Sequence, residues 1–249
     1  MALYTDSSVF GIEELQAHET GILDVAHAEG IDLSVKIALA REEVGLQILS
    51  ALRRLTETES AGISLNTVVV TSPLRLWQIF HTLAITYRDA YNNQLNDRYK
   101  GKWQEYRELA RWAAGLLLQI GLGVVVDPVP EAEAPQLTAA PGGLAEGKYF
   151  VRVAWLNASG EEGVAGQLAS STVVSGNTIQ VQAVNPPANA VAWNAYVGRS
   201  PHDLFRQNGS PVTAGGSFMV ASLVLTGARP GTGQEPDLFR QVPRVFPRG

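Results

Sequence analysis

The stretch NDRYKGKWQEYRELARWAAGLLLQIG, residues 96–121, decides how the first half of the chain is interpreted, because it mixes aromatic residues with Arg, Lys and Glu. Seven of its residues follow one another at steps of three and four, and therefore share one side of a helix. They are Tyr99, Trp103, Tyr106, Ala110, Ala113, Leu117 and Ile120. This spacing predicts a helix whose stripe packs against other helices.

The alternative is a basic, aromatic helix that binds nucleic acid. Such a helix needs a net positive face, with aromatic rings free to stack on bases. The charged residues of this stretch lie off the stripe and are mixed in sign, which is typical of a solvated face. They are Lys100, Lys102, Glu105, Arg107, Glu108 and Arg111. The packed, structural interpretation is therefore favoured.

Three more helices are predicted before this one, at about residues 12–19, 32–55 and 72–91. Asp32 can cap the second, whose apolar face is broad, as in a helix that packs on more than one side. Ser72 can cap the third, where Pro73 takes the first helical position and its missing N–H costs nothing. Residues 1–122 thus predict a helical domain.

The composition changes near residue 122. Residues 123–147 are rich in Pro, Ala and Glu, which predicts a semi-rigid linker. Residues 148–228 then show alternating apolar and polar positions, as in YFVRVAW, TIQVQ and AVAWNAYV, separated by turns rich in Gly, Asn and Ser. Short strands at this spacing predict a small antiparallel β-sandwich. The expected fold class is α+β in two domains, followed by an extended tail at residues 229–249.

Whole-chain composition narrows the possible functions. The chain has 249 residues, 45% of them hydrophobic, and a formal net charge of −5, which disfavours a protein that coats DNA. It has no cysteine, so disulfides and thiol catalysis are excluded. The first residues, MALYTDSSVFG, lack the pattern of a signal peptide. The most apolar run is too short to span a bilayer, so no membrane association is expected.

No motif for catalysis, cofactor binding or metal binding was found. The sequence has no H-E-x-x-H, P-loop or G-x-S-x-G pattern. His81 fits a packed or capped helix residue, and the adjacent pairs Glu13–Glu14 and Glu42–Glu43 point in different directions on a helix. We therefore expect a protein that is not an enzyme and has no catalytic residue, cofactor or metal site. An active site assembled from distant residues is the alternative.

Two resemblances to phage proteins follow from quoted stretches. YFVRVAWLNASGEEG and VAWNAYVGRS resemble strands of the fibronectin type III and immunoglobulin-like domains of tailed-phage virion proteins. That resemblance covers about 80 residues and implies an adhesive or decorative domain. Residues 3–121, including DVAHAEGIDLSVKIALAREEVGLQILSAL, resemble helical adaptor proteins of the phage head–tail connector.

The second resemblance implies a structural protein of the virion neck, assembled in the host cytoplasm. Adaptors of this family form rings with copies of themselves, which implies a dodecameric ring here. The expected partners are the portal protein and a tail or stopper protein, and DNA passes through without specific binding. The alternative is a surface or secreted binding protein whose β-sandwich recognises a protein or glycan.

The tail carries the residues expected to contact the portal. From Arg229 onward it has four basic and two acidic residues among apolar ones, a combination that fits a peptide docking in a groove. Its prolines are expected to keep it out of helices and central strands, and mobile in the free protein. The alternative is a frayed end with no role. The predicted docking residues are Leu238, Phe239, Arg240, Arg244 and Phe246.

Overall fold

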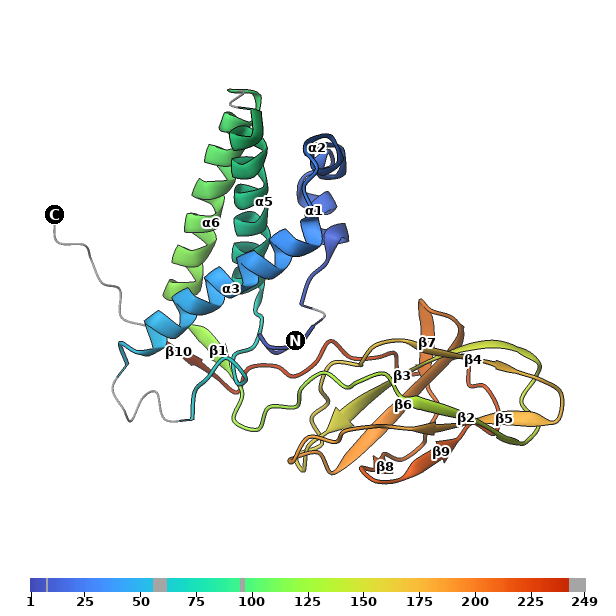
Figure 1. The fold of residues 1–249 in the computed structure, drawn as a ribbon. Helices are drawn as coiled ribbons and strands as arrows, with labels where there is room; N and C mark the ends of the chain where they lie inside the picture. The colour runs from blue at the N-terminus through green and yellow to red at the C-terminus, as the bar shows by residue number, and fades with distance from the viewer. Residues whose placement is uncertain (8, 56–61, 95–96, 242–249) are drawn as a thin grey trace. The chain divides into compact units, whose positions relative to one another are not determined.

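A computed structural model describes residues 1–7, 9–55, 62–94 and 97–241. The chain divides into two compact units (Figure 1). We call Ser8–Val124 with Pro236–Gly249 the helical unit, and Met1–Ser7 with Val125–Glu235 the sheet unit. The chain is thus mixed helix and antiparallel sheet, as expected of an α+β protein. In the described parts, no helix has the length and apolar character needed to cross a membrane.

The helical unit contains each helix that the sequence predicted and one that it did not. Asp32 caps α3 as expected, since its carboxylate accepts hydrogen bonds from the amides of Ser34 and Val35. The additional helix is α2, which lies between Gly21 and the left-handed Gly30. The elements are α1 (Ile12–His18), α2 (Ile22–Glu29), α3 (Leu33–Leu52), α5 (Ser72–Gln94), the 3₁₀ helix η1 (Asp97–Tyr99) and α6 (Lys100–Ile120).

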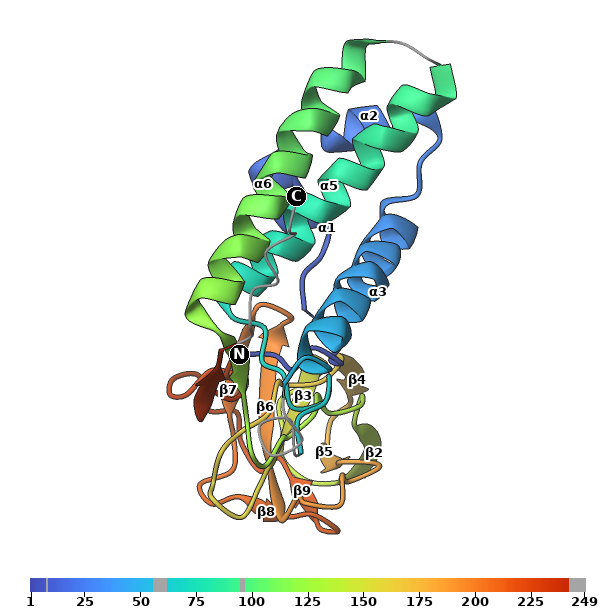
Figure 2. The ribbon, with the colours of Figure 1, turned by 90° about the vertical axis from the view of Figure 1, so that its left-hand side faces the viewer.

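Helix α5 is the centre of this unit, packed against both α3 and α6, which lie on different sides of it (Figure 2). The predicted stripe of α6 is buried at Tyr106, Ala110, Ala113 and Leu117, which confirms a helix that packs on its neighbours. At the C-terminal end of the helix the prediction is wrong, because the side chain of Ile120 is 42% exposed.

Aromatic rings hold α5 and α6 together. The ring of Tyr87 stacks on that of Tyr106, with centroids 5.7 Å apart, and Tyr91 stacks on Trp103 at 5.9 Å. The Arg107 guanidinium lies over the Trp103 ring, 5.7 Å from its centroid. Aromatic pairs at these distances add about 0.5–1.5 kcal/mol beyond burial. Tyr99, Trp103 and Tyr106 of the opening stretch are therefore occupied in contacts within the helical unit.

A two-stranded sheet brings the end of the chain back to the helical unit. Strand β1 (Leu122–Val124) pairs antiparallel with β10 (Leu238–Arg240), with Gly123 opposite Phe239. A Cβ on Gly123 would lie 2.9 Å from both Pro236 and Thr71, so glycine permits this close approach. The prediction of an unpaired tail is therefore wrong for residues 238–240. The prolines of the tail lack the backbone N–H that strand pairing uses. Residues 238–240 contain no proline, and these three residues are enough to pair with the equally short β1.

The sheet unit consists of short strands in two antiparallel sheets. One sheet has the order β2-β5-β9, and the other has β4-β3-β6-β7, with β8 also paired to β6. The strands are β2 (Gln136–Pro141), β3 (Gly147–Leu156), β4 (Ala169–Val173), β5 (Asn177–Gln182), β6 (Ala192–Ser200), β7 (Asp203–Arg206), β8 (Val212–Thr213) and β9 (Ser217–Met219).

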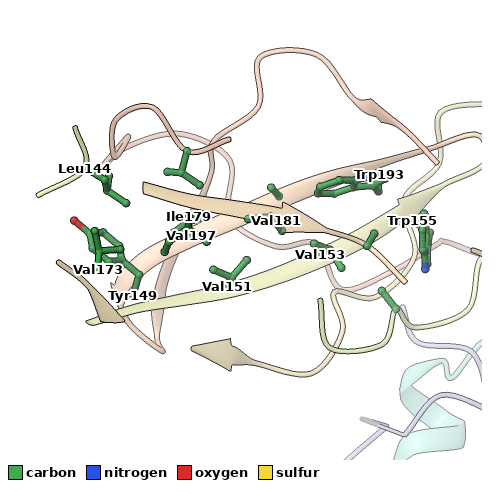
Figure 3. Packing of buried hydrophobic residues seen from close by; sticks show 14 of the residues in the cluster. Leu144, Tyr149, Val151, Val153, Trp155, Val173, Ile179, Val181, Trp193 and Val197 are labelled. Carbon is green, nitrogen blue, oxygen red and sulfur yellow. The ribbon is translucent and has the colours of Figure 1, made fainter. Parts of the chain in front are cut away.

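Both sheets contribute to one hydrophobic core, shown in Figure 3. The alternation read from the sequence sets which side chains enter it, because successive residues of a strand point to opposite faces. Strand β3 contributes alternate residues from Tyr149 to Trp155, β5 contributes Ile179 and Val181, and β6 contributes alternate residues from Trp193 to Val197. Trp155 and Trp193 are cross-strand partners, and both are fully buried.

The predicted linker at residues 123–147 is instead largely part of the sheet unit. Residues 136–141 form strand β2, which pairs with β5, and Val129, Ala132 and Leu144 are buried in the shared core. The segment looked like a linker because β2 lies at a sheet edge, where most of its side chains are exposed and where Pro141 is tolerated at the strand end.

The segment just before β10 is also fixed, which corrects the expectation of a mobile tail from residue 229. The side chain of Gln234 is buried, and its oxygen accepts the amide of Val129 at 2.6 Å. Its nitrogen donates to the Asp127 carbonyl and to the Glu161 carboxylate, each at 3.0 Å. The N-terminal ammonium group donates to the Gln234 backbone carbonyl at 2.7 Å. One glutamine therefore ties several segments of the sheet unit together.

Paired leucine substitutions test which helix faces carry the stability. Leu117→Ala should lower the free energy of unfolding of the helical unit by about 2–5 kcal/mol, because Leu117 is buried in the seam of α6. Leu46→Ala is the matched control and should change it by less than about 0.5 kcal/mol, since Leu46 is 67% exposed. Urea unfolding measures both. Equal losses would contradict the packing described.

Two fragments of the sheet unit test the place of β2. Residues 125–235 should give a β-type circular dichroism spectrum and a cooperative thermal transition, because they contain both sheets. Residues 148–228 lack β2 and Leu144 and should melt at a clearly lower temperature or not fold. Identical melting temperatures would show that β2 is not an integral strand.

Candidate interaction surfaces

The structure describes three of the five predicted docking residues. Leu238 and Arg240 are half-buried in β10, and Phe239 points to the opposite side of the strand, where its side chain is 50% exposed. Arg244 and Phe246 lie outside the described residues. Phe239 is therefore the predicted anchor that is on a folded element and still open to solvent.

Helix α3 has apolar residues on two opposite sides. One side is buried at Leu33, Val44 and Ile48. At 100° per residue, the other side carries residues spaced by about one or two turns. These are Val35, Leu39, Leu46 and Leu49, which we call the α3 stripe. The exposed Glu42 lies on the same side of the helix, between Leu39 and Leu46. Val35 is 57% exposed and Leu46 is 67% exposed, whereas Leu39 and Leu49 are half-buried. The broad apolar face predicted for this helix is thus covered on one side only.

Helix α6 has a second apolar row beside its packed seam. It consists of Leu109, Trp112, Leu116 and Ile120, which we call the α6 stripe. Trp112 is 55% exposed, and Leu109 and Leu116 are half-buried. The sequence did not predict this row, because its residues alternate along the helix with those of the seam and Ile120 was assigned to the seam. The visible signal was an aromatic residue, Trp112, at a position outside the seam.

Polar side chains in the helical unit gather around Glu19. Its carboxylate accepts hydrogen bonds from the Tyr106 hydroxyl at 2.7 Å and from the Lys102 ammonium at 2.9 Å. Burial by itself raises the pKa of Glu19, but the bonds from Lys102 and Tyr106 and the charge of Lys102 outweigh it and lower that pKa. Burial and the bond to Glu19 raise the pKa of Tyr106. The group links the end of α1 to α6.

Two further titratable contacts are satisfied pairs between separate segments of the chain. His81 on α5 lies 2.6 Å from the Glu43 carboxylate on α3, as fits a packed helix residue. In the sheet unit, Glu162 accepts hydrogen bonds from Tyr196 and Asn194, both at 2.6 Å. Across the described residues, no three or more His, Asp or Glu side chains are grouped so that they could hold a metal ion.

The sheet unit has one recess that combines aromatic, cationic and apolar groups. It has a volume of about 420 Å³ and is lined by Leu144, Tyr149, Arg199, Leu223 and Leu225, among others. Arg199 lies over the Tyr149 ring, 5.2 Å from its centroid, and donates to the Tyr149 hydroxyl at 3.0 Å. The recess is shallow and open, so it suits the side chain of a partner better than an enclosed small molecule.

Comparison with known proteins gives no relative. No protein-family model matches the chain, and neither a curated protein nor a solved structure matches it significantly.

The Glu19 group predicts a pH dependence. A carboxylate whose pKa is lowered by folding contributes stability above its unfolded value, near 4.5, and this contribution is lost as the pH falls through the folded pKa. The helical unit should therefore lose stability as the pH falls below about 4.5. Glu19→Gln should reduce that loss, whereas the exposed Glu13→Gln should not, as measured by urea unfolding at each pH. An unchanged slope in Glu19→Gln would contradict the assignment.

Proposed function

We propose that this chain is a structural assembly protein, an adaptor of the head–tail connector of a tailed phage. It would form a ring in the virion neck, between the portal protein and a tail or stopper protein, through which DNA passes. The resemblance of residues 3–121 to connector adaptors supports this proposal. The observation that carries it is the pair of helix faces on one unit that expose apolar side chains, Val35 and Leu46 on α3 and Trp112 and Ile120 on α6, because clustered exposed apolar residues are typical of protein–protein contacts.

In this proposal the sheet unit is an immunoglobulin-like or fibronectin type III-like domain at the periphery of the ring. The paired antiparallel sheets and the Tyr-x-Val-x-Val pattern of β3 support this assignment. The β-sandwich would then contact other neck proteins or decorate the particle.

A second candidate function is a binding protein whose β-sandwich recognises a protein or glycan. The recess beside Tyr149 and Arg199 favours it, since an aromatic face with a neighbouring guanidinium suits both kinds of partner. It leaves the stripes of the helical unit without a role, which is why the connector function is preferred.

Portal docking is assigned to the exposed side of β10. Phe239 offers an apolar ring of which half is exposed, on a strand held by β1, so little ordering entropy is lost on binding. Arg240 is adjacent, and the chain continues into the arginine-containing end. In this assignment the pairing with β1 presents the anchor to the portal.

The experiment is co-purification of the full-length chain with the portal protein encoded in the same phage genome. The wild-type chain should bind portal rings, and Phe239→Ala should weaken binding at least about tenfold, as expected for a central aromatic anchor. Met219→Ala removes an apolar side chain of the sheet unit that is 50% exposed, as Phe239 is, and serves as the control. Absence of any association with the portal would overturn the proposed function. Equal binding by Phe239→Ala would move the docking surface away from β10.

A further inference from the structure

The recess in the sheet unit has walls that are fixed in place. Leu144 is buried in the shared core, at the same end of it as Tyr149 (Figure 3). The opposite wall is formed within residues 222–225, which are held by Gln207. The side chain of Gln207 accepts the amide of Val224 at 2.7 Å and donates to the carbonyl of the same residue at 3.0 Å. The recess is therefore a preformed feature of the folded unit.

The guanidinium of Arg199 is held in one orientation in this recess. Its Nη2 donates to the Tyr149 hydroxyl at 3.0 Å and to the Glu146 backbone carbonyl at 3.2 Å. The Tyr149 hydroxyl in turn donates to the Ala145 carbonyl at 2.7 Å. Within the described residues, Nε and Nη1 of Arg199 form no hydrogen bond. These groups can bind an anion with little further loss of side-chain entropy.

The charge of the recess is that of Arg199. It is the only charged residue among the described ones that line the recess. The acidic residue beside the recess is Glu146, which contributes its backbone carbonyl, and its exposed carboxylate forms no ion pair with Arg199. The rest of the lining is mainly aliphatic, with Leu225 68% exposed at the rim. The recess thus combines one available cation with an apolar wall.

We propose that this recess binds an extended segment of a partner protein that carries one Asp or Glu side chain beside an aliphatic one. The carboxylate would pair with Arg199, and the aliphatic side chain would lie against Leu223 and Leu225. This inference goes beyond the proposed function and does not depend on it, since it concerns the sheet unit alone.

A carboxylate suits the recess better than a phosphate group does. A carboxylate carries one negative charge, which one guanidinium balances, and its two oxygens match the fork of N–H groups. A phosphorylated side chain carries about −1.5 to −2 at pH 7 and would need a second cation, which the described lining does not contain.

A protein segment also suits the recess better than a glycan does. The side chain of Tyr149 is only 1% exposed, and Arg199 lies over its ring. The tyrosine therefore supports the arginine and offers almost no free aromatic face to a sugar. The exposed surface is that of leucine side chains, which bury favourably against other aliphatic groups.

Selection from a displayed library of random heptapeptides, with the full-length chain as the immobilised target, tests this inference. The enriched peptides should contain one Asp or Glu next to Leu, Ile or Val. Arg199→Gln should abolish this preference. Arg199 is exposed, so the variant should keep the melting temperature of the wild-type chain.

Fluorescence polarisation with an enriched peptide made synthetically gives the size of the effect. Arg199→Gln should weaken binding about tenfold or more, as expected when hydrogen bonds to a charged group are lost. Leu225→Ser should weaken it roughly threefold, because an apolar contact is removed at the rim. Replacing the acid of the peptide by its amide should match the loss seen in Arg199→Gln.

Two variants serve as controls. Arg229 also lies over an aromatic ring, that of Phe205 at 5.2 Å, but it already pairs with Asp203 at 2.9 Å. Arg229→Gln should therefore bind the peptide as the wild type does. Glu146→Gln should not weaken binding, because only the backbone of Glu146 contributes to the site.

Several outcomes would overturn the inference. They are a selection without enrichment, equal peptide affinity in the wild type and Arg199→Gln, and tighter binding of a peptide whose acid is replaced by phosphoserine. None of them bears on portal binding, which is measured separately with Phe239→Ala. Failure of the recess would leave the connector function standing, and absence of portal binding would leave the peptide site standing.

Discussion

The burial of helix α5 is the constraint on which the helical unit depends. Every residue from Leu74 to Tyr91 is buried or half-buried, so neighbouring segments must cover most of the helix surface. Its buried threonines meet this demand locally, since the hydroxyls of Thr82 and Thr86 donate to carbonyls one turn earlier at 2.8 Å. A buried hydroxyl without a partner would be costly, and these bonds avoid that cost. Helices α1, α2, α3 and α6 all pack against α5 as a result.

Covering α5 uses only part of the apolar surface that the surrounding helices offer. Helix α3 contributes one side and keeps a second apolar side in solvent, and α6 does the same beside its seam. Exposed apolar area costs roughly 25 cal/mol per Å² relative to burial, so rows containing Leu46 and Trp112 favour association. The packing that stabilises the helical unit thus leaves two apolar surfaces exposed on it, which the proposed assembly would bury. This link connects the fold to the proposed assembly.

The sequence predicted those parts of the fold that depend on local periodicity. The steps of three and four residues located α6, the Asp32 cap marked the start of α3, and the alternation around Val151 and Val153 located the core strand β3. Helix α2 was missed because it is only 8 residues long and lies between glycines, which are read as breaks. Strand β2 was missed because an edge strand shows little apolar alternation.

Long-range pairing could not be predicted from local pattern. Val124 pairs with Leu238, and the Val129 amide bonds to Gln234, across more than a hundred residues of chain in each case. Nothing within either short segment identifies its partner. The same limit applies to the interaction surfaces: Phe239 was recognised as an exposed apolar anchor, but its strand was not. The α6 stripe became visible only when the exposure of Trp112 was compared with the buried seam.

Native mass spectrometry of the purified full-length chain over a range of concentrations tests the central claim most directly, namely that the exposed apolar faces of the helical unit drive assembly of several copies into a ring. The account predicts oligomers larger than dimers whose population rises with concentration, and their loss when Trp112 is replaced by Glu. A chain that stays monomeric at the highest concentration, or an assembly that stops at the dimer, would contradict it.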